Sequence, residues 1–246
     1  MPYGAKTSFI ALIPKKENEV DVKDFFPFSL GNTIPKIISK ILMNRMGSLM
    51  KDHISMNQFS FFPRRNIQHC LFTASEGVNF MSRKSKDENF TLKIDIYKAF
   101  DTLKWIFLYN LLRRYGFSSA FINLINVILN SSRLSILING APRGYFQCTR
   151  GVRQGDPLLG LLFAIANDYL SSGINDFVHL SLYKKVRARR NDHVPSHLLY
   201  APDILLFGQA LRKTISVIKG LFARYEKVYR QAISWDKSFI IFSDGL

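Results

Sequence analysis

The chain has 246 residues, 47% of them apolar, so it is long enough to bury a substantial core and lacks the composition of a disordered protein. Its 34 lysines and arginines against 18 acidic residues give a formal net charge of +16, which indicates a polyanionic partner, with nucleic acid the first candidate and a membrane surface the alternative. The sequence shows no uncharged apolar run of about 18 residues, no lipidation motif and no signal-peptide core, so we expect a nuclear or cytoplasmic protein that is not secreted and binds no membrane.

The first elements along the chain are a strand and two helices. Residues 7–13 have the pattern of a strand, which Pro14 ends. A helix is predicted after Asn32 and Thr33, because Pro35 is tolerated in a first turn and apolar residues then recur at helical spacing. These apolar residues are Ile37, Ile38, Ile41, Leu42, Met46 and Leu49. A second helix is predicted over residues 67–82.

The middle of the chain predicts a strand followed by two helices. Residues 90–95 have a strand pattern, and residues 102–115 have apolar positions on one helical face, with Gly116 as the stop. Ser118 or Ser119 then caps the next helix. A hairpin follows at residues 134–138, because Asn139 and Gly140 suit a tight primed turn.

The last part of the chain begins with Asp156 and Pro157, which suit the cap and first position of a helix. A hairpin over residues 197–207, a helix over about 211–228 and a β-like end at 233–242 complete the pattern. We find no internal repeat and no long linker, which favours one continuous unit. The elements predict an α+β fold, with helices packed on one face of a mainly antiparallel sheet.

Three short segments carry the residue types of a phosphoryl-transfer site. Residues 92–101 are a strand-like run that delivers Asp95, residues 149–158 are a basic, glycine-containing loop, and residues 197–207 are two apolar runs meeting at a turn before Asp203. In-line displacement on a triphosphate needs two Mg²⁺ ions about 3.5–4 Å apart, and Mg²⁺ prefers carboxylate oxygens. A carboxylate at a strand end beside a hairpin turn would supply such a site.

The order and wording of these segments resemble motifs A, B and C of reverse transcriptases, specifically those of plant-like LINE-type (non-LTR) retrotransposons. The resemblance implies the α+β fold of a right-hand polymerase, with fingers, an antiparallel palm sheet backed by helices, and no thumb. It implies one reverse transcriptase domain over residues 1–246, with about 1–89 mainly fingers and about 90–246 mainly palm, including interleaved fingers segments. The implied partners are an RNA template, a DNA primer and deoxynucleoside triphosphates, and the implied cofactor is Mg²⁺, with Mn²⁺ as an alternative.

Motif A supplies the first site residues by this resemblance. Asp95 would bind metal, Ile96 would add its backbone carbonyl, and Phe100 would be the bulky gate that crowds a ribose 2′-hydroxyl. Taken one residue at a time, Asp95 could instead be a strand-end cap and Phe100 a core residue.

Motif C departs from the family pattern. The family has an aromatic residue, alanine and two aspartates, whereas this chain has Tyr200, Ala201, Pro202 and Asp203. Asp203 is thus the one carboxylate of the turn and the second expected metal ligand. Because proline offers no ligand and no N–H, we expect a weakened metal site and a polymerase slowed by orders of magnitude.

Motif B is the most specific segment, since this sequence of residues rarely occurs by chance. Gly155 would let the backbone approach the nucleotide or template, Gln154 would offer hydrogen bonds, and Arg150 and Arg153 would contact phosphates. The alternative is an ordinary loop before a capped helix, and Gly160 stands where the family usually has proline.

Three further segments resemble the family and also differ from it. In residues 24–30, Phe26 replaces an arginine. In residues 57–65, Arg65 would hold the triphosphate, but Arg64 replaces a glycine. In the motif D segment 231–238, Lys237 is the expected proton donor to pyrophosphate, and Arg230 stands at the usual glycine position.

A basic run before motif C would contact template or primer phosphates, although it could also be a solvated loop. The run comprises Lys184, Lys185, Arg187, Arg189 and Arg190. Cys70 and Cys148 are too few for a disulfide framework or a zinc site, so we expect no disulfide partner.

The sequence therefore predicts RNA-directed DNA polymerase ancestry, with impaired catalysis in this degenerate or partial copy. Two alternatives stay open: a catalytically dead palm that binds nucleic acid, and a decayed transposon product with no selected role. Two-metal chemistry requires convergence. We therefore expect Asp95 and Asp203 close together at a sheet edge, with Phe100, Gln154 and Gly155 around one cleft that Arg65 faces.

Overall fold

The computed structural model describes residues 7–17, 21–62, 64–81, 88–130, 133–152, 155–186 and 194–243. The chain divides into two compact units, each built from two stretches of sequence. The first unit comprises Met1–Met46 and Leu103–Leu162, and the second comprises Gly47–Thr102 and Phe163–Leu246. The units are interleaved in sequence, and the expected division into fingers and palm near residue 89 stays a prediction.

The first unit contains a four-stranded sheet in the order β2-β1-β4-β5. Strand β1 (Thr7–Pro14) pairs antiparallel with β2 (Phe25–Gly31) and parallel with β4 (Arg133–Ile138), which pairs with β5 (Ala141–Gln147). Asn139 and Gly140 join β4 to β5 with φ of 51° and 77°. Both angles are positive, as a type I′ turn requires, so the Asn-Gly prediction is confirmed.

Three helices belong wholly or mostly to this unit: α1 (Thr33–Met50), α4 (Trp105–Arg114) and α5 (Ser119–Asn130). The helix expected over residues 102–115 is confirmed as α4, which starts three residues later than expected, and the short helix α3 (Ala99–Thr102) before Leu103 was not predicted. Lys104 is extended, with ψ of 128°, and Leu103 is buried. The break between α3 and α4 therefore allows the side chain of Leu103 to be buried. Helical periodicity alone does not reveal such a break. Strand β2, preceded by the 3₁₀ turn η2 (Val22–Asp24), was also not predicted.

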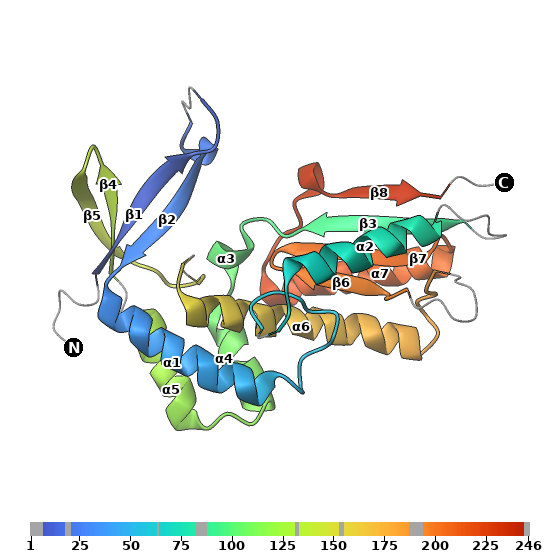
Figure 1. The fold of residues 1–246 in the computed structure, drawn as a ribbon, viewed down its shortest axis with the longest axis horizontal. Coiled ribbons are helices and arrows are strands. Elements are labelled where there is room, and N and C mark those ends of the chain that lie inside the picture. Colours follow the sequence, from blue (N-terminus) through green and yellow to red (C-terminus); the bar gives the residue numbers. More distant parts are fainter. Residues whose placement is uncertain are drawn as a thin grey trace. The chain divides into compact units, whose positions relative to one another are not determined.

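The second unit contains an antiparallel sheet in the order β6-β7-β3-β8 (Figure 1). Its strands are β3 (Asn89–Asp95), β6 (His197–Tyr200), β7 (Asp203–Gln209) and β8 (Phe239–Phe242). Its helices are α2 (Ile67–Met81), the short α3, α7 (Arg212–Tyr229), the 3₁₀ turn η3 (Trp235–Lys237) and most of α6 (Pro157–His179). These elements carry the motif A, C and D segments.

Helices cover both faces of this sheet, whereas the sequence predicted one covered face. Leu198 and Phe207 pack on one face in a cluster with Cys70 and Met81 of α2. On the opposite face, the Ser171 hydroxyl of α6 lies 2.6 Å from Nε2 of His197. Strand β3 needs cover on both sides because most of its side chains are buried, irrespective of the face to which they point.

Helix α7 lies beside α6 on that second face. The rings of Tyr169 in α6 and Tyr229 in α7 are 5.8 Å apart, and a Cβ added to Gly173 would lie 3.2 Å from the side chain of Leu221. Helix α6 is long and apolar enough to cross a membrane, but 78% of its most apolar window is buried. It is therefore accounted for as a core helix.

Candidate active site

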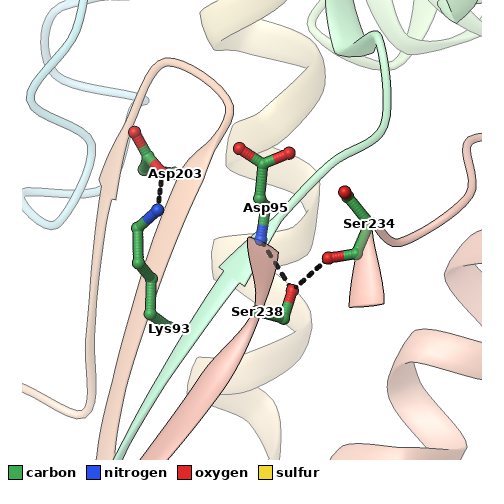
Figure 2. Close-up of polar contacts among 5 residues, drawn as sticks. All are labelled: Lys93, Asp95, Asp203, Ser234 and Ser238. Carbon is green, nitrogen blue, oxygen red and sulfur yellow. Dashed lines mark hydrogen bonds and ion pairs between the residues drawn. The ribbon is translucent and has the colours of Figure 1, made fainter. Parts of the chain in front are cut away.

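Asp95 and Asp203 lie opposite each other in the antiparallel register of β3 and β7 (Figure 2). Residues directly opposite in such a pair have Cβ atoms about 4.5–5.5 Å apart and point to the same face. Strand β3 ends at Asp95 and β7 begins at Asp203, so the two carboxylates meet at the end of the sheet. They share the face of Leu205 and Phe207, which α2 covers.

The turn before Asp203 has only two central residues, since Tyr200 pairs directly with Asp203. Ala201 has φ of 52°, and Nδ2 of Asn167, a buried side chain of α6, donates to its carbonyl at 2.9 Å. Proline holds φ near −65°, so Pro202 excludes a type I′ turn and leaves the type II′ pattern, whose first position favours glycine. A proline ring thus stands where the family places a carboxylate.

Lys93 is a neighbour that the motifs did not identify. Its Nζ lies 2.7 Å from Oδ1 of Asp203 (Figure 2). Lys93 is two residues before Asp95 on β3, so both side chains lie on one face. The ammonium offsets repulsion between the two carboxylates, although the side chains are 29% and 44% exposed, so that solvent screens the pair. The two-residue strand period was the signal in the sequence.

The segment around Lys237 holds the backbone of Asp95. The Asp95 N–H donates to Oγ of Ser238 at 3.1 Å, and the Asp95 carbonyl accepts from the Ser234 N–H at 2.8 Å. Ser238 in turn donates to the Ser234 carbonyl at 2.8 Å (Figure 2). Lys237 lies between these serines in η3 with an exposed side chain, so this segment lies next to motif A.

Ile96 continues this contact through an isolated antiparallel bridge to Ile233. The hydrogen bonds flanking the bridge join Tyr97 to Ala232 and Ser234 to Asp95. Ile96 is therefore in a non-hydrogen-bonded position, and its carbonyl points away from the motif D segment. That carbonyl is thereby left for another donor or a cation.

Gln231 joins the motif D segment to the short helix after Asp95. Its Nε2 donates to the Ala99 carbonyl at 2.6 Å and to Oγ1 of Thr102 at 3.2 Å, while its Oε1 accepts from the Tyr225 hydroxyl at 2.6 Å. Arg230 precedes it with φ of 54° and caps the end of α7. A left-handed conformation favours glycine, which accounts for the family residue at this position.

Arg64 has the same conformation, with φ of 65°. Both positions at which arginine replaces a family glycine are therefore left-handed. This backbone costs a residue with a Cβ about 1–2 kcal/mol. The two substitutions thus place strain in turns of the second unit.

The donors of Arg65 are directed at its own loop. Its Nη1 donates to the carbonyls of Ser55 at 2.6 Å and Gln58 at 2.5 Å, and its Nη2 donates to the carbonyl of Ile54 at 3.2 Å. Burial lowers the pKa of this guanidinium, and the nearby Asp168 carboxylate opposes that change. The observed role of Arg65 is to hold residues 54–58, and its triphosphate contact stays a prediction.

Phe100, the expected ribose gate, is half-buried among aromatic rings. Its ring centroid lies 4.2 Å from that of Phe163 and 6.2 Å from that of Phe61. These contacts restrict the ring, as a steric gate requires, and they equally fit a core residue.

The motif B loop belongs to the first unit. Gly155 has φ of 96°, so its backbone conformation requires glycine. Asp156 caps α6, because its Oδ1 accepts from the Leu158 N–H at 3.1 Å. Arg150 is exposed, whereas Arg153 and Gln154 lie outside the described residues. A cleft shared by this loop and Asp95 stays a prediction.

Only the first two residues of the basic run, Lys184 and Lys185, are described, and both are exposed. Arg187, Arg189 and Arg190 lie outside the described residues. The phosphate contacts expected of all five stay predictions.

His197, at the start of motif C, is fully buried on the face away from the carboxylates. Its Nδ1 lies 2.9 Å from the Ser196 hydroxyl, and its Nε2 lies 2.6 Å from the Ser171 hydroxyl. Burial lowers its pKa to about 3, and the Lys185 ammonium contributes to the decrease. His197 is therefore a neutral hydrogen-bonding residue that fixes β6 on α6.

The carboxylates of Asp95 and Asp203 and the carbonyl of Ile96 are hard oxygen donors, which suit Mg²⁺ or Mn²⁺. Among the described residues, no three His, Cys, Asp or Glu side chains gather into a metal site. Asp203 already contacts the Lys93 ammonium, and Pro202 adds no donor. The donor set therefore fits one divalent ion and falls short of two.

Comparisons with known proteins identify the family of this chain. Residues 13–244 match the reverse transcriptase (RNA-dependent DNA polymerase) family. The chain is 30% identical over 166 residues to the transposon TX1 uncharacterized 149 kDa protein of Xenopus laevis, a match covering 68% of the chain and 13% of that protein. It is 24% identical over 243 residues to the Pol polyprotein of the R2DM retrotransposable element of Drosophila melanogaster, covering 98% of the chain and 22% of that protein.

Solved structures with this fold include telomerases. The apo telomerase of Candida tropicalis truncated from its C-terminal domain superposes with a TM-score of 0.63 at 14% identity, covering 99% of the chain and 51% of that structure. Telomerase of Candida albicans, in complex with the TWJ fragment of telomeric RNA, gives 0.64 at 14% identity, covering 98% and 44%. At such identity the likeness shows the fold alone. The chain belongs to the reverse transcriptase family, as a domain of the LINE-type, non-LTR retrotransposon class with an α+β fold of palm and fingers.

Proposed function

We propose that this chain is the polymerase region of a non-LTR retrotransposon protein, that it performs RNA-directed DNA synthesis, and that Pro202 slows the reaction. The observation that carries the proposal is the register pairing of Asp95 with Asp203 at the end of two buried strands. Reverse transcriptases generally use divalent metal ions. Here Asp95, Asp203 and the Ile96 carbonyl would hold one Mg²⁺ or Mn²⁺, which would supply activation of the primer hydroxyl.

The other residues would bind and orient the substrates. Phe100 would exclude a ribose 2′-hydroxyl, Gln154 and Gly155 would contact the nucleotide or template, Arg65 would contact the triphosphate, and Lys237 would donate a proton to pyrophosphate. The basic side chains would contact the phosphates of the RNA template and DNA primer. They are Arg150, Arg153, Lys184, Lys185, Arg187, Arg189 and Arg190.

Impaired catalysis rests on two observations at the turn. Pro202 offers no oxygen donor, and the Lys93 ammonium contacts the remaining Asp203 carboxylate at 2.7 Å. A cation already placed on a metal ligand competes with a metal for that ligand. These features favour, as a second candidate function, a palm that binds nucleic acid without turnover.

Primer extension on an RNA template, with Mg²⁺ and Mn²⁺ compared, tests the first proposal. We expect slow extension that is greater with Mn²⁺, because Mn²⁺ tolerates a less regular donor set. Extension at the rate of an intact relative would contradict the impairment. No extension with either metal, by a folded protein that binds hybrid, would favour the binding-only palm.

Binding of an RNA–DNA hybrid, measured by fluorescence anisotropy from 50 to 200 mM salt, tests the second candidate. Phosphate contacts do not need residue 202, so we expect binding that weakens steeply as salt rises. Absence of binding at low salt, or binding that is insensitive to salt, would contradict the claim that the net charge of +16 serves to bind nucleic acid.

A further inference from the structure

Helix α7 carries a row of exposed cations that the polymerase site does not use. The exposed basic residues are Arg212, Lys213, Lys219, Arg224 and Lys227. At 3.6 residues per turn they occupy about 140° of the circumference. Glu226 is the one acidic residue of α7, and its Oε1 accepts from the Ile233 N–H at 2.9 Å. The outward face of this helix is therefore strongly positive along its whole length.

Small residues lie between these cations. Ser216, Gly220 and Ala223 are exposed near the centre of the same face, and a Cβ added at Gly220 would meet no atom within 4 Å. The large aromatic side chains of α7, such as Phe222 and Tyr225, are buried on the other side, and among its large apolar side chains only Val228 is exposed. Because these side chains are short, the middle of the exposed face is recessed relative to the cations around it. A rod-like polyanion can therefore approach the helix and contact cations on both sides.

Lys184 extends the cationic surface beyond the helix. Its backbone N–H donates to Oγ1 of Thr214, in the first turn of α7, at 3.4 Å, and the residue is exposed. The described start of the basic run before motif C therefore adjoins α7. We call Lys184 and the five α7 cations the α7 basic face.

The α7 basic face is separated from the catalytic carboxylates by the sheet. Asp95 and Asp203 lie on the face that α2 covers, together with Phe207. His197 and α6 mark the opposite face, where α7 lies beside α6 (Figure 1). A polyanion on α7 is therefore not the substrate at Asp95.

We propose that the α7 basic face binds the phosphate backbone of a nucleic-acid duplex, as a second site that acts in addition to the proposed template–primer site. The 18-residue helix is about 27 Å long, comparable to about eight phosphate spacings along one strand. The aromatic residues of α7 are all buried, so the face offers no stacking platform for single-stranded bases. Val228 is the one exposed large apolar side chain of α7, which is too few for the apolar face by which a membrane-surface helix inserts.

Removal of charge from α7 tests this proposal against an equal removal elsewhere. The α7 variant combines Lys213→Gln, Arg224→Gln and Lys227→Gln, and the control combines Lys40→Gln, Arg113→Gln and Arg114→Gln at exposed positions of the first unit. Both variants lose three positive charges, so their net charges remain equal. All six sites are on helix surfaces, and circular dichroism checks that both variants fold.

Binding of labelled 20-base-pair DNA and RNA duplexes is measured by anisotropy from 50 to 200 mM salt, with one equivalent of unlabelled RNA–DNA primer–template present to occupy the proposed template–primer site. We expect the α7 variant to lose about tenfold or more in affinity and about two to three units of slope in log K against log salt, and the control to change less than twofold. Equal losses in both variants would overturn the proposal. So would exclusion of both duplexes by bound primer–template, or tighter binding of a single strand than of either duplex.

Discussion

The paired strands of the second unit and the turns at their ends differ in how well they keep the family pattern. Strands β3 and β7 have buried side chains and an unbroken register that sets Asp95 against Asp203. By contrast, Arg64, Ala201 and Arg230 all have positive φ without being glycine. The buried strands are intact, while the turns carry strained or unsuitable residues.

The difference has a physical reason. A buried strand accepts any of several apolar residues of suitable size, because burial and packing are the quantities that matter. A left-handed turn or a metal ligand requires one particular residue type, because a Cβ or a missing oxygen has no substitute. Sequence change can therefore remove catalysis from this domain long before it removes the fold.

The largest expected effect is on catalysis at the turn. Pro202→Asp restores a carboxylate beside Asp203 and opposite Asp95, and we expect primer extension to rise about ten- to hundredfold. The increase stays limited, because Arg64 still strains the nearby loop and Lys93 still contacts Asp203. Steady-state extension with Mg²⁺ measures the change.

Asp95→Asn is the matched control in both backgrounds and should abolish any extension, since it removes the motif A carboxylate. If the unmodified chain extends primers as fast as the Pro202→Asp variant, then the turn does not limit catalysis and the comparison between strands and turns loses its main consequence.

The next effect is a pH dependence of stability that originates in the buried strand β6. Burial lowers the pKa of His197 to about 3 in the folded protein, whereas its pKa is near 6.5 in the unfolded chain. Between these values the unfolded state binds the additional proton, so stability from neutral His197 is complete above pH 6.5 and decreases as the pH falls. We expect a decrease of about 1.6 kcal/mol in the free energy of unfolding between pH 6.5 and 5.

Urea denaturation of the wild type and of His197→Gln at several pH values measures this effect. Glutamine keeps hydrogen-bonding capacity and does not titrate, so the variant should show a shallower pH dependence over the same interval. Parallel curves for the two proteins would show that His197 is not held neutral, and that β6 is less firmly packed than the structure indicates.

A smaller effect is expected at Lys93. Lys93→Met removes the ammonium that contacts Asp203, so Mn²⁺ should bind about tenfold more tightly, equivalent to about 1.4 kcal/mol. Isothermal titration calorimetry measures the affinity, and Lys93→Arg is the control that keeps the charge. Unchanged or weaker Mn²⁺ binding by the methionine variant would show that Lys93 does not compete for the site.

The smallest effects are expected at the two left-handed arginines. Arg64→Gly and Arg230→Gly relieve backbone strain but give the unfolded chain more freedom, so each should raise the free energy of unfolding by at most about 1 kcal/mol. Arg224→Gly in the interior of α7 is the control and should lower stability by about 1 kcal/mol. If glycine lowers the free energy of unfolding at Arg64 and Arg230 as well as at Arg224, the two turns are not strained.

Most elements could be predicted from local sequence, because their signals lie within a few residues. The helix starting at Pro157, the Asn139–Gly140 turn and the strands around Asp95 and Asp203 have bounds close to those expected. The family and its fold could also be identified from the motif segments. The break at Leu103 and strand β2 could not, because burial against distant residues decides them.

The site divides in the same way. The sequence by itself determined which residues are expected to carry the chemistry, including Asp95, Asp203 and the proline before Asp203, since residue identity decides what can bind a metal. Only the tertiary structure decided that Lys93 contacts Asp203, that Ser234 and Ser238 hold Asp95, and that Arg65 donates to its own loop. These contacts depend on strand register, side-chain direction and chain crossings between separate segments, which no local pattern specifies.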